Sequence, residues 1–345
     1  MIQINNTIIT KKSKTNFNEK ISISSLTLSL LIILIMILIL VAPVTYSKSV
    51  INGLKLYFTA VLPGLLPFMF LCKLLTCIGV IDKLAKPLNK PMRKLFGLNG
   101  SCFYAFIMSI ISGYPIGSKI TADLYNQGKI SDKELTRCAL LSSTSGPIFV
   151  IGSVGGIMLS SLKAGIIIYV SNLIGVLLTS IIINLFSKKQ QNTISNLQKH
   201  EFTKQQFSLY LLAKDTVINL LIVGFYISLF SLFIDLLTNL NIINILSNLL
   251  GKILSITPIN PSFSTGIMSG IFEMTNGCKT LSSTISAQNI SLICFVISFS
   301  GLSIIIQSLS FLSATHIKPH KFILGKFLQA IISFIICLII SSLFL

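Results

Sequence analysis

Runs of apolar residues long enough to cross a lipid bilayer recur along this chain, and they constrain its fold more than any other feature. Residues 25–42, 164–186 and 290–312 contain no charged side chain. A helix of about 20 such residues matches the hydrocarbon core of a bilayer. The mean hydropathy is +0.86 and only 10% of the 345 residues are charged, so a soluble domain of this size could not bury the apolar surface. We therefore predict an all-α polytopic membrane protein with about 8–10 hydrophobic segments.

The formal net charge of +18 comes from lysines and arginines that lie between the apolar runs. That placement is typical of the positive-inside rule and of contact with anionic headgroups. We therefore predict a lipid bilayer as a partner and no nucleic acid. The seven cysteines include no CxxC pair and mostly lie in apolar runs, where they act as small buried side chains.

Polar segments divide the chain into five parts. Residues 1–24 form a basic polar arm, and residues 25–43 form an anchor helix whose apolar core is long for a signal peptide, the alternative interpretation. Residues 50–186 and 215–345 are rich in apolar runs, and we assign them to two transmembrane repeats. The polar linker 187–214, with five lysines and one acid, separates these repeats.

Matching interruptions relate the two repeats. In the first, Ser112-Gly113 is followed 33 residues later by Ser145-Gly146. In the second, Ser269-Gly270 is followed 31 residues later by Ser300-Gly301. Interrupted hydrophobic segments at corresponding positions of two halves are the best sequence indication of a transporter binding site. We therefore expect broken helices at all four positions.

The lysines indicate how the two repeats are oriented. If residues 101–118 form a re-entrant hairpin, the basic loops 81–99, 119–137 and 187–214 all lie on the cytoplasmic side, as the positive-inside rule requires. The first repeat then crosses the membrane an odd number of times. The second repeat is therefore inverted relative to the first, and residues 262–279 re-enter from the opposite side.

Glu273 follows the apolar run that begins at Ser262, so we expect its carboxylate at membrane depth. A carboxylate there is costly and is by default a functional candidate: it could bind a coupling cation, accept a proton or contact a solute. Placement at the interface, or pairing with Lys279, is the alternative. Lys119 and Lys279, one in each repeat, could steer an anionic solute or extend to the headgroups.

Small and neutral polar residues at the interruptions complete the predicted site. Broken helices expose backbone N–H groups that attract anions, and glycines allow close approach, although Gly113-x-x-x-Gly117 also suits plain helix packing. The predicted substrate-binding residues are Ser112, Gly113, Lys119, Thr144, Ser145, Gly146, Glu273, Thr275, Asn276, Ser300 and Gln307.

The sequence favours transport over catalysis. It contains no Walker motif, no GxSxG and no nucleophile–base pair, and His316 and His320 have no evident third metal ligand. We predict no enzyme activity, no cofactor and no resident metal, and a coupling cation or proton stays open. The predicted partners are a small anionic solute and, as a further option, a second copy of the chain.

Four segments resemble the YlbJ family of sporulation integral membrane proteins. They are residues 112–122, 144–152, 270–277 and 299–303, the last together with Gln307. The resemblance implies a nucleoside recognition (Gate) domain. It also implies movement of dipicolinic acid, a small flat dianion, across the outer forespore membrane of an endospore-forming bacterium. A nucleoside or other small-solute carrier, and a non-transporting sporulation scaffold, are the alternatives.

The sequence departs from the family pattern at a few positions. Ser143 stands where the family often has Asn before the Thr-Ser-Gly-Pro motif, and Ser300 replaces the first Gly of Gly-Gly-Leu-Ser. Ile305 stands where a His is common two residues before the Gln, so no role of that His carries over.

Cysteine accessibility labelling tests the inverted arrangement. In a background without the native cysteines, we expect single cysteines at Lys129 and Lys279 to react with a membrane-impermeant reagent from opposite sides. A cysteine at Lys90 serves as the control and should react from the same side as Lys129. Reaction of positions 129 and 279 from one side would exclude the inverted topology.

Overall fold

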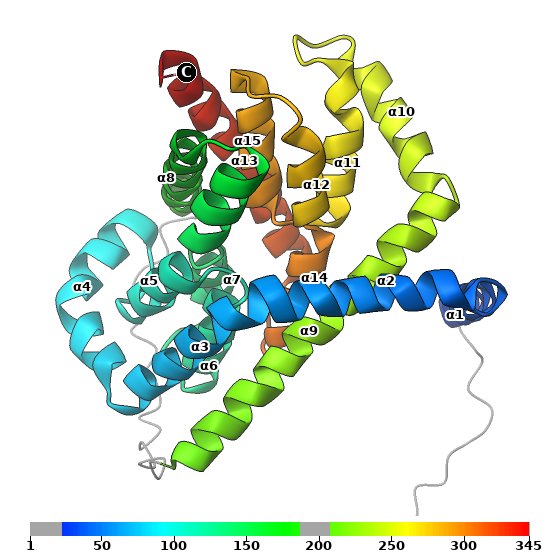
Figure 1. Ribbon diagram of the computed structural model, residues 1–345. Helices are drawn as coiled ribbons and strands as arrows, with labels where there is room; N and C mark the ends of the chain where they lie inside the picture. Colours follow the sequence, from blue (N-terminus) through cyan, green and yellow to red (C-terminus); the bar gives the residue numbers. More distant parts are fainter. Residues whose placement is uncertain (1–22, 187–207, 345) are drawn as a thin grey trace, which may run out of the picture. The chain divides into compact units, whose positions relative to one another are not determined.

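The computed structural model describes residues 23–186 and 208–344, which contain helices and no strand (Figure 1). The chain divides into two compact units, Met1–Ser47 and Lys48–Leu345. In the first unit, α1 (Ile23–Val41) is the predicted anchor helix. It ends just before Ala42-Pro43, because a proline disfavours helical geometry in the preceding residue. Nearly all of the predicted polar arm lies outside the described residues.

The helices follow one another in two series. The first series is α2 (Pro43–Leu56), η1 (Tyr57–Val61), α3 (Leu62–Cys77), α4 (Val80–Phe96), α5 (Ser101–Ser112), α6 (Ile116–Asn126), α7 (Asp132–Leu141), η2 (Ile148–Met158) and α8 (Leu162–Phe186). The second is α9 (Leu209–Asn239), α10 (Ile242–Leu254), η3 (Pro261–Phe263), α11 (Ser264–Phe272), α12 (Met274–Leu281), α13 (Ala287–Phe299), α14 (Gly301–Phe311) and α15 (Pro319–Phe344).

The two series share one order of elements. After an amphipathic helix, α4 or α10, come two helix–break–helix units and then one long apolar helix, α8 or α15. We call residues 113–115 and 142–146 the first and second breaks of the first half, and Glu273 and Ser300 the first and second breaks of the second half. The predicted all-α membrane fold with broken helices is confirmed. The inverted orientation of the halves stays a prediction.

Each first break joins two short antiparallel helices. In the second half, Gly277 packs against Gly270, and Gly266 packs against the side chain of Leu281. In the first half, Gly117 packs against Ser109 and the Ser142 carbonyl. The helices α5 and α6 have 12 and 11 residues, and α11 and α12 have 9 and 8. At about 1.5 Å per residue, none of the four can cross a core of about 30 Å. They therefore form helical hairpins, as predicted for residues 101–118 and 262–279.

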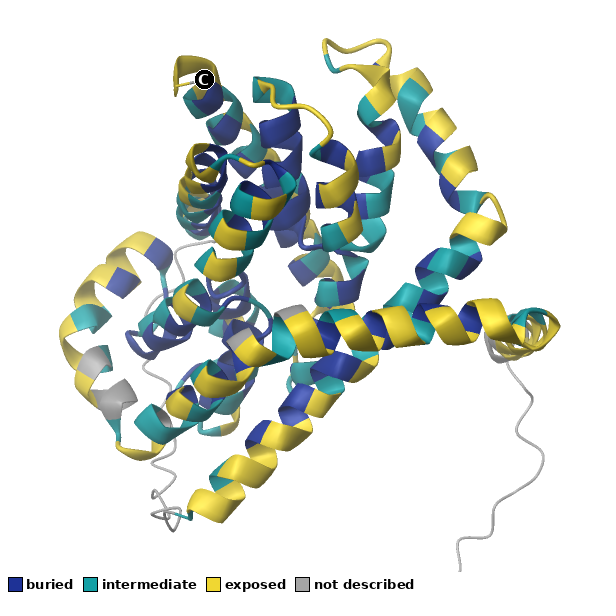
Figure 2. Cartoon of the chain, in the orientation of Figure 1, coloured by how far each residue is buried: buried dark blue, intermediate teal, exposed yellow. Residues whose placement is uncertain are grey.

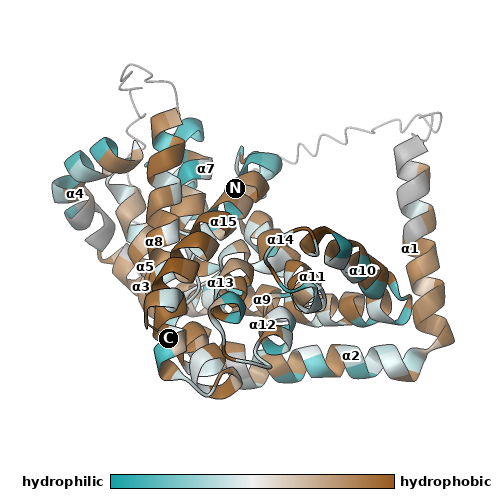
Figure 3. Ribbon diagram, turned by 90° about the horizontal axis from the view of Figure 1, so that it is seen from above, coloured by the Kyte–Doolittle hydropathy of each residue, from teal (hydrophilic) through white to brown (hydrophobic). Residues whose placement is uncertain are grey.

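Within residues 23–186 and 208–344, four helices are long and apolar enough to cross a membrane, and two bent helix pairs could bring the number to six. The span Ala287–Phe311, which contains α13 and α14, is 78% buried in its apolar window, whereas the Pro319–Phe344 span is 28% buried (Figure 2). Helix α13 therefore lies at the centre, packed against α8 and α15. Hydrophobic residues line most of α8 and α15 (Figure 3). Such faces suit contact with lipid.

Three segments differ from the sequence prediction. The break expected at Ser269-Gly270 lies three residues later, at Glu273, because both residues stay helical in α11, where Gly270 packs against Gly277. The predicted basic loop 81–99 is largely helix α4, because its apolar residues recur at helical spacing: Met92 and Phe96 are buried, while the lysines point outward. The predicted linker 187–214 lies mostly outside the described residues, but its last residues belong to α9. That helix begins at Leu209 because the Ser208 hydroxyl accepts a hydrogen bond from the Leu211 N–H.

Gly277 tests the packing of the second hairpin. A Cβ at this position would meet the backbone of Gly270 and lie 3.0 Å from the Gly266 carbonyl oxygen, and backbone cannot move aside as a side chain can. We expect Gly277→Ala to destabilise the protein by about 1–3 kcal/mol. The matched control is Gly152→Ala, because a Cβ at Gly152 meets nothing within 4 Å. Thermal unfolding in detergent gives the measurement, and equal unfolding temperatures for both variants would contradict the hairpin packing.

Candidate functional site

The two breaks of the first half lie against each other. Gly113 has a φ of +79°, and a Cβ there would lie 2.5 Å from the Gly146 nitrogen, so only glycine allows this approach. The Ser109 hydroxyl lies 3.1 Å from the Thr144 hydroxyl and accepts a hydrogen bond from the Thr144 N–H at 3.1 Å. The structure thus brings together five predicted site residues, namely Ser112, Gly113, Thr144, Ser145 and Gly146.

The two breaks of the second half are arranged in the same way. Gly301, with a φ of +69°, packs against the first break: a Cβ there would lie 3.0 Å from the Gly270 oxygen and 3.4 Å from the Glu273 Cα. Ser300 is buried and also has a positive φ, +73°. Glu273, Thr275 and Ser300 therefore belong to one cluster. In both halves, the Ser-Gly of the second break seals the tip of the hairpin.

Glu273 acts as the N-cap of α12. Its carboxylate accepts hydrogen bonds from the Thr275 N–H at 2.8 Å and the Asn276 N–H at 2.7 Å. A negative charge at a helix N-terminus is favourable, because it meets the free amides and the positive end of the helix dipole. The amides that we expected to attract an anion are therefore already occupied by the chain's own carboxylate. The Asn276 side chain is exposed.

Three predicted residues lie apart from the breaks. Lys119 forms an ion pair with Asp123 on its own helix at 2.8 Å and is 27% exposed. Lys279 is exposed near the end of α12. Gln307 is buried and donates a hydrogen bond to the Val223 carbonyl on α9 at 3.3 Å. In this conformation Lys119 is therefore a partly buried, ion-paired cation, and Lys279 is a surface cation.

The two halves meet at the breaks of the first half. The Tyr114 hydroxyl, in the first break, donates a hydrogen bond to the Ile297 carbonyl on α13 at 2.9 Å and lies beside Ser300. The Ser143 carbonyl, in the second break, accepts hydrogen bonds from Lys326 at 3.1 Å and Gln329 at 3.3 Å, both on α15. These contacts join residues far apart in the sequence into one buried polar cluster.

Lys326 belongs to this cluster, although no sequence motif pointed to it. Its side chain is fully buried, at 0% exposure, and its ammonium nitrogen lies 5.1 Å from the centre of the Tyr114 ring. The signal was present in the sequence: Lys326 is the only charged residue between Phe322 and Leu345. An ionisable residue inside an apolar span is a functional candidate by default.

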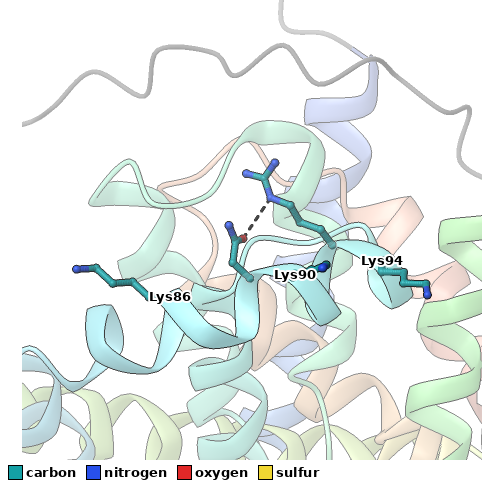
Figure 4. A pocket seen from close by; sticks show the side chains of 5 residues that line it. Lys86, Lys90 and Lys94 are labelled. Carbon is teal, nitrogen blue, oxygen red and sulfur yellow. Dashed lines mark hydrogen bonds between the residues drawn. The ribbon is translucent and has the colours of Figure 1, made fainter.

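A second group of cations lies on the surface of α4. An open depression of about 620 Å³ is lined by Lys86, Asn89, Lys90, Arg93 and Lys94. In Figure 4 the side chains of Lys86 and Lys94 extend away from the helix, and the Asn89 side-chain oxygen accepts a hydrogen bond from Arg93 Nε at 3.2 Å. Exposed cations on an amphipathic helix suit headgroup phosphates better than an enclosed solute.

Comparison with known proteins agrees with these motifs. A family model described as nucleoside recognition (Gate) matches residues 58–165, which include both breaks of the first half. The sporulation integral membrane protein YlbJ of Bacillus subtilis (strain 168) is 27% identical over 300 residues, covering 81% of this chain and 74% of that protein. The predicted resemblance is confirmed. The chain is thus similar to YlbJ over most of its length. No solved structure was found to match the chain.

Substitution of Glu273 tests its role as a cap of α12. We expect Glu273→Ala to lower the free energy of unfolding by about 1 kcal/mol, because two amides lose their acceptor. Glu273→Ser should recover most of that loss, since serine is a strong N-cap without a charge. Thermal or chemical unfolding in detergent measures both. If Glu273→Ser is as unstable as Glu273→Ala, the charge rather than the cap stabilises this end of α12.

Proposed function

We propose that this chain is a sporulation membrane carrier that moves dipicolinic acid, a small aromatic dianion, across the outer forespore membrane. The observation that carries the proposal is the pairing of two helix breaks within each half. Gly113 packs on the second break of the first half, and Gly301 packs on the first break of the second half. Paired broken helices in two related halves are a known architecture of secondary transporters.

The physical reason is the cost of interrupting a helix in an apolar environment. Each break frees backbone groups that lipid cannot hydrogen-bond, so such breaks are tolerated where they are enclosed by protein or line a polar path. A protein that only anchored or scaffolded an assembly could use plain helices instead. Two hairpins too short to cross, each sealed by a second broken helix, therefore favour a solute path.

The nature of the solute rests on the relatives. The similar B. subtilis protein is named as a sporulation protein, and dipicolinate is the small dianion that the family resemblance implies. The description of the Gate model as nucleoside recognition supports a nucleoside carrier as the second candidate.

Uptake by proteoliposomes tests the solute. We expect vesicles containing the purified chain to accumulate labelled dipicolinate well above protein-free vesicles, and to take up uridine no faster than the protein-free control. Uptake of uridine without dipicolinate would favour the nucleoside carrier. Uptake of neither solute, together with assembly defects in cells lacking the gene, would favour the scaffold.

Two substitutions test the predicted site residues in the same assay. We expect Glu273→Gln, which keeps one acceptor oxygen for the α12 amides, and Lys119→Ala to reduce dipicolinate uptake at least tenfold while the protein still elutes as one folded species. Unchanged uptake in both variants would remove these residues from the solute path. In spores, loss of the gene should abolish dipicolinate content, and added dipicolinate should restore it.

A further inference from the structure

We propose that Lys326, together with Gln329, forms a carboxylate-binding site for the transported solute, and that the Ser143 carbonyl occupies this site in the present conformation. This inference rests on the proposed transport of a small aromatic carboxylate. It names a site on α15 that the motifs of the chain do not include. The site lies where the second break of the first half meets the last helix of the second half.

The first observation is a buried lysine without a matching anion. The ammonium of Lys326 has three partners in the described part of the chain: the Ser143 carbonyl at 3.1 Å, the Gln329 side-chain oxygen at 3.2 Å and the face of the Tyr114 ring. All three are neutral, and among the described residues no carboxylate lies within ion-pair distance. Burying a charge without a counter-charge is costly, so a cation at this position calls for an anionic partner.

The second observation is the geometry of the donors. The Lys326 ammonium and the Gln329 amide are three residues apart, on one face of α15, and both donate to the same Ser143 oxygen. Two donors that converge on one oxygen form the arrangement that a carboxylate oxygen needs. A charged carboxylate accepts such hydrogen bonds more strongly than a neutral carbonyl does. A solute carboxylate can therefore displace Ser143 and release the second break.

The third observation comes from the corresponding position in the other half. Asn172, on α8, is fully buried and donates a hydrogen bond to the Ser298 hydroxyl at 2.6 Å. Ser298 lies two residues before Ser300-Gly301, as Ser143 lies two residues before Ser145-Gly146. The last helix of each half thus contacts a residue next to, or in, the second break of the other half. Helix α8 does so through a neutral amide, and α15 does so through a lysine. Packing of the halves does not itself require a cation.

The neighbouring aromatic ring indicates the class of ligand. Tyr114 presents its face to the Lys326 ammonium and is held in place by its hydrogen bond to Ile297. A flat aromatic acid could place its ring against Tyr114 and its carboxylate against Lys326, which keeps the cation–π and stacking geometry favourable. The site therefore suits pyridine or benzene carboxylates.

The test compares ligands that differ only in the charge at one group. We expect the unaltered chain, purified in detergent, to bind picolinate at least tenfold more tightly than its neutral amide, picolinamide. In Lys326→Met this ratio should fall to about one, because the methionine fills the space without a charge. Lys326→Arg should keep a ratio above one. The matched control is Lys321→Gln, which removes an exposed cation from the same helix and should leave the ratio unchanged.

Folding and transport are measured on the same variants. Replacing a buried cation by an apolar side chain often leaves stability unchanged or raises it, so Lys326→Met should unfold no earlier than the unaltered chain. A lower unfolding temperature together with an unchanged ligand ratio would make Lys326 a structural residue and overturn the inference. If the unaltered chain takes up dipicolinate and Lys326→Met does so equally well, the transport proposal stands and the site fails. If the unaltered chain neither takes up dipicolinate nor prefers picolinate to picolinamide, both fail.

Discussion

The contact between paired helix breaks is the constraint on which the rest of this structure depends. A helix that stops inside an apolar environment frees backbone groups, and they must be enclosed by other parts of the protein. In the first half, Gly113 and Gly146 enclose each other, and in the second half Gly301 encloses the backbone at Glu273. Each contact requires a hairpin to fold back far enough to reach the second break. The short hairpin helices and the glycines at the two contacts, Gly113 and Gly301, follow from it.

The sequence predicted three of the four breaks, because a Ser-Gly pair marks each of them. The fourth pair, Ser269-Gly270, lies inside α11, and the helix ends at Glu273 instead. The sequence did not predict α4 as a helix, because its many lysines and two prolines resemble a polar loop until the positions of Met92 and Phe96 are compared. Nor did it predict that Glu273 caps α12. Glutamate is not among the preferred cap residues, and only the extended backbone at this break aims its carboxylate at the following amides.

The contact made by Lys326 could not be predicted from sequence motifs. Its contact with Ser143 joins residues 183 positions apart, and no spacing rule connects them. Composition alone would have found it, because one lysine inside an apolar span is unusual enough to need an explanation. Lys119 and Lys279 attracted attention because they follow the breaks in the sequence. The structure pairs Lys119 with Asp123 and leaves Lys279 exposed, whereas the fully buried lysine lies on α15.

The two contacts that join the last helix of one half to the other half differ in strength. This difference affects how easily the two halves can move relative to each other. Lys326 reaches the second break of the first half, and Asn172 reaches the helix that leads into the second break of the second half. A hydrogen bond from an ammonium is stronger than one from a neutral amide, so without an anion the first contact holds its break more firmly than the second. In the proposed site, an anion would take over the donors of Lys326 and remove this difference. The conformational change of the proposed carrier would then cost less with the solute bound than without it, which is the property that a carrier needs to move its solute rather than leak.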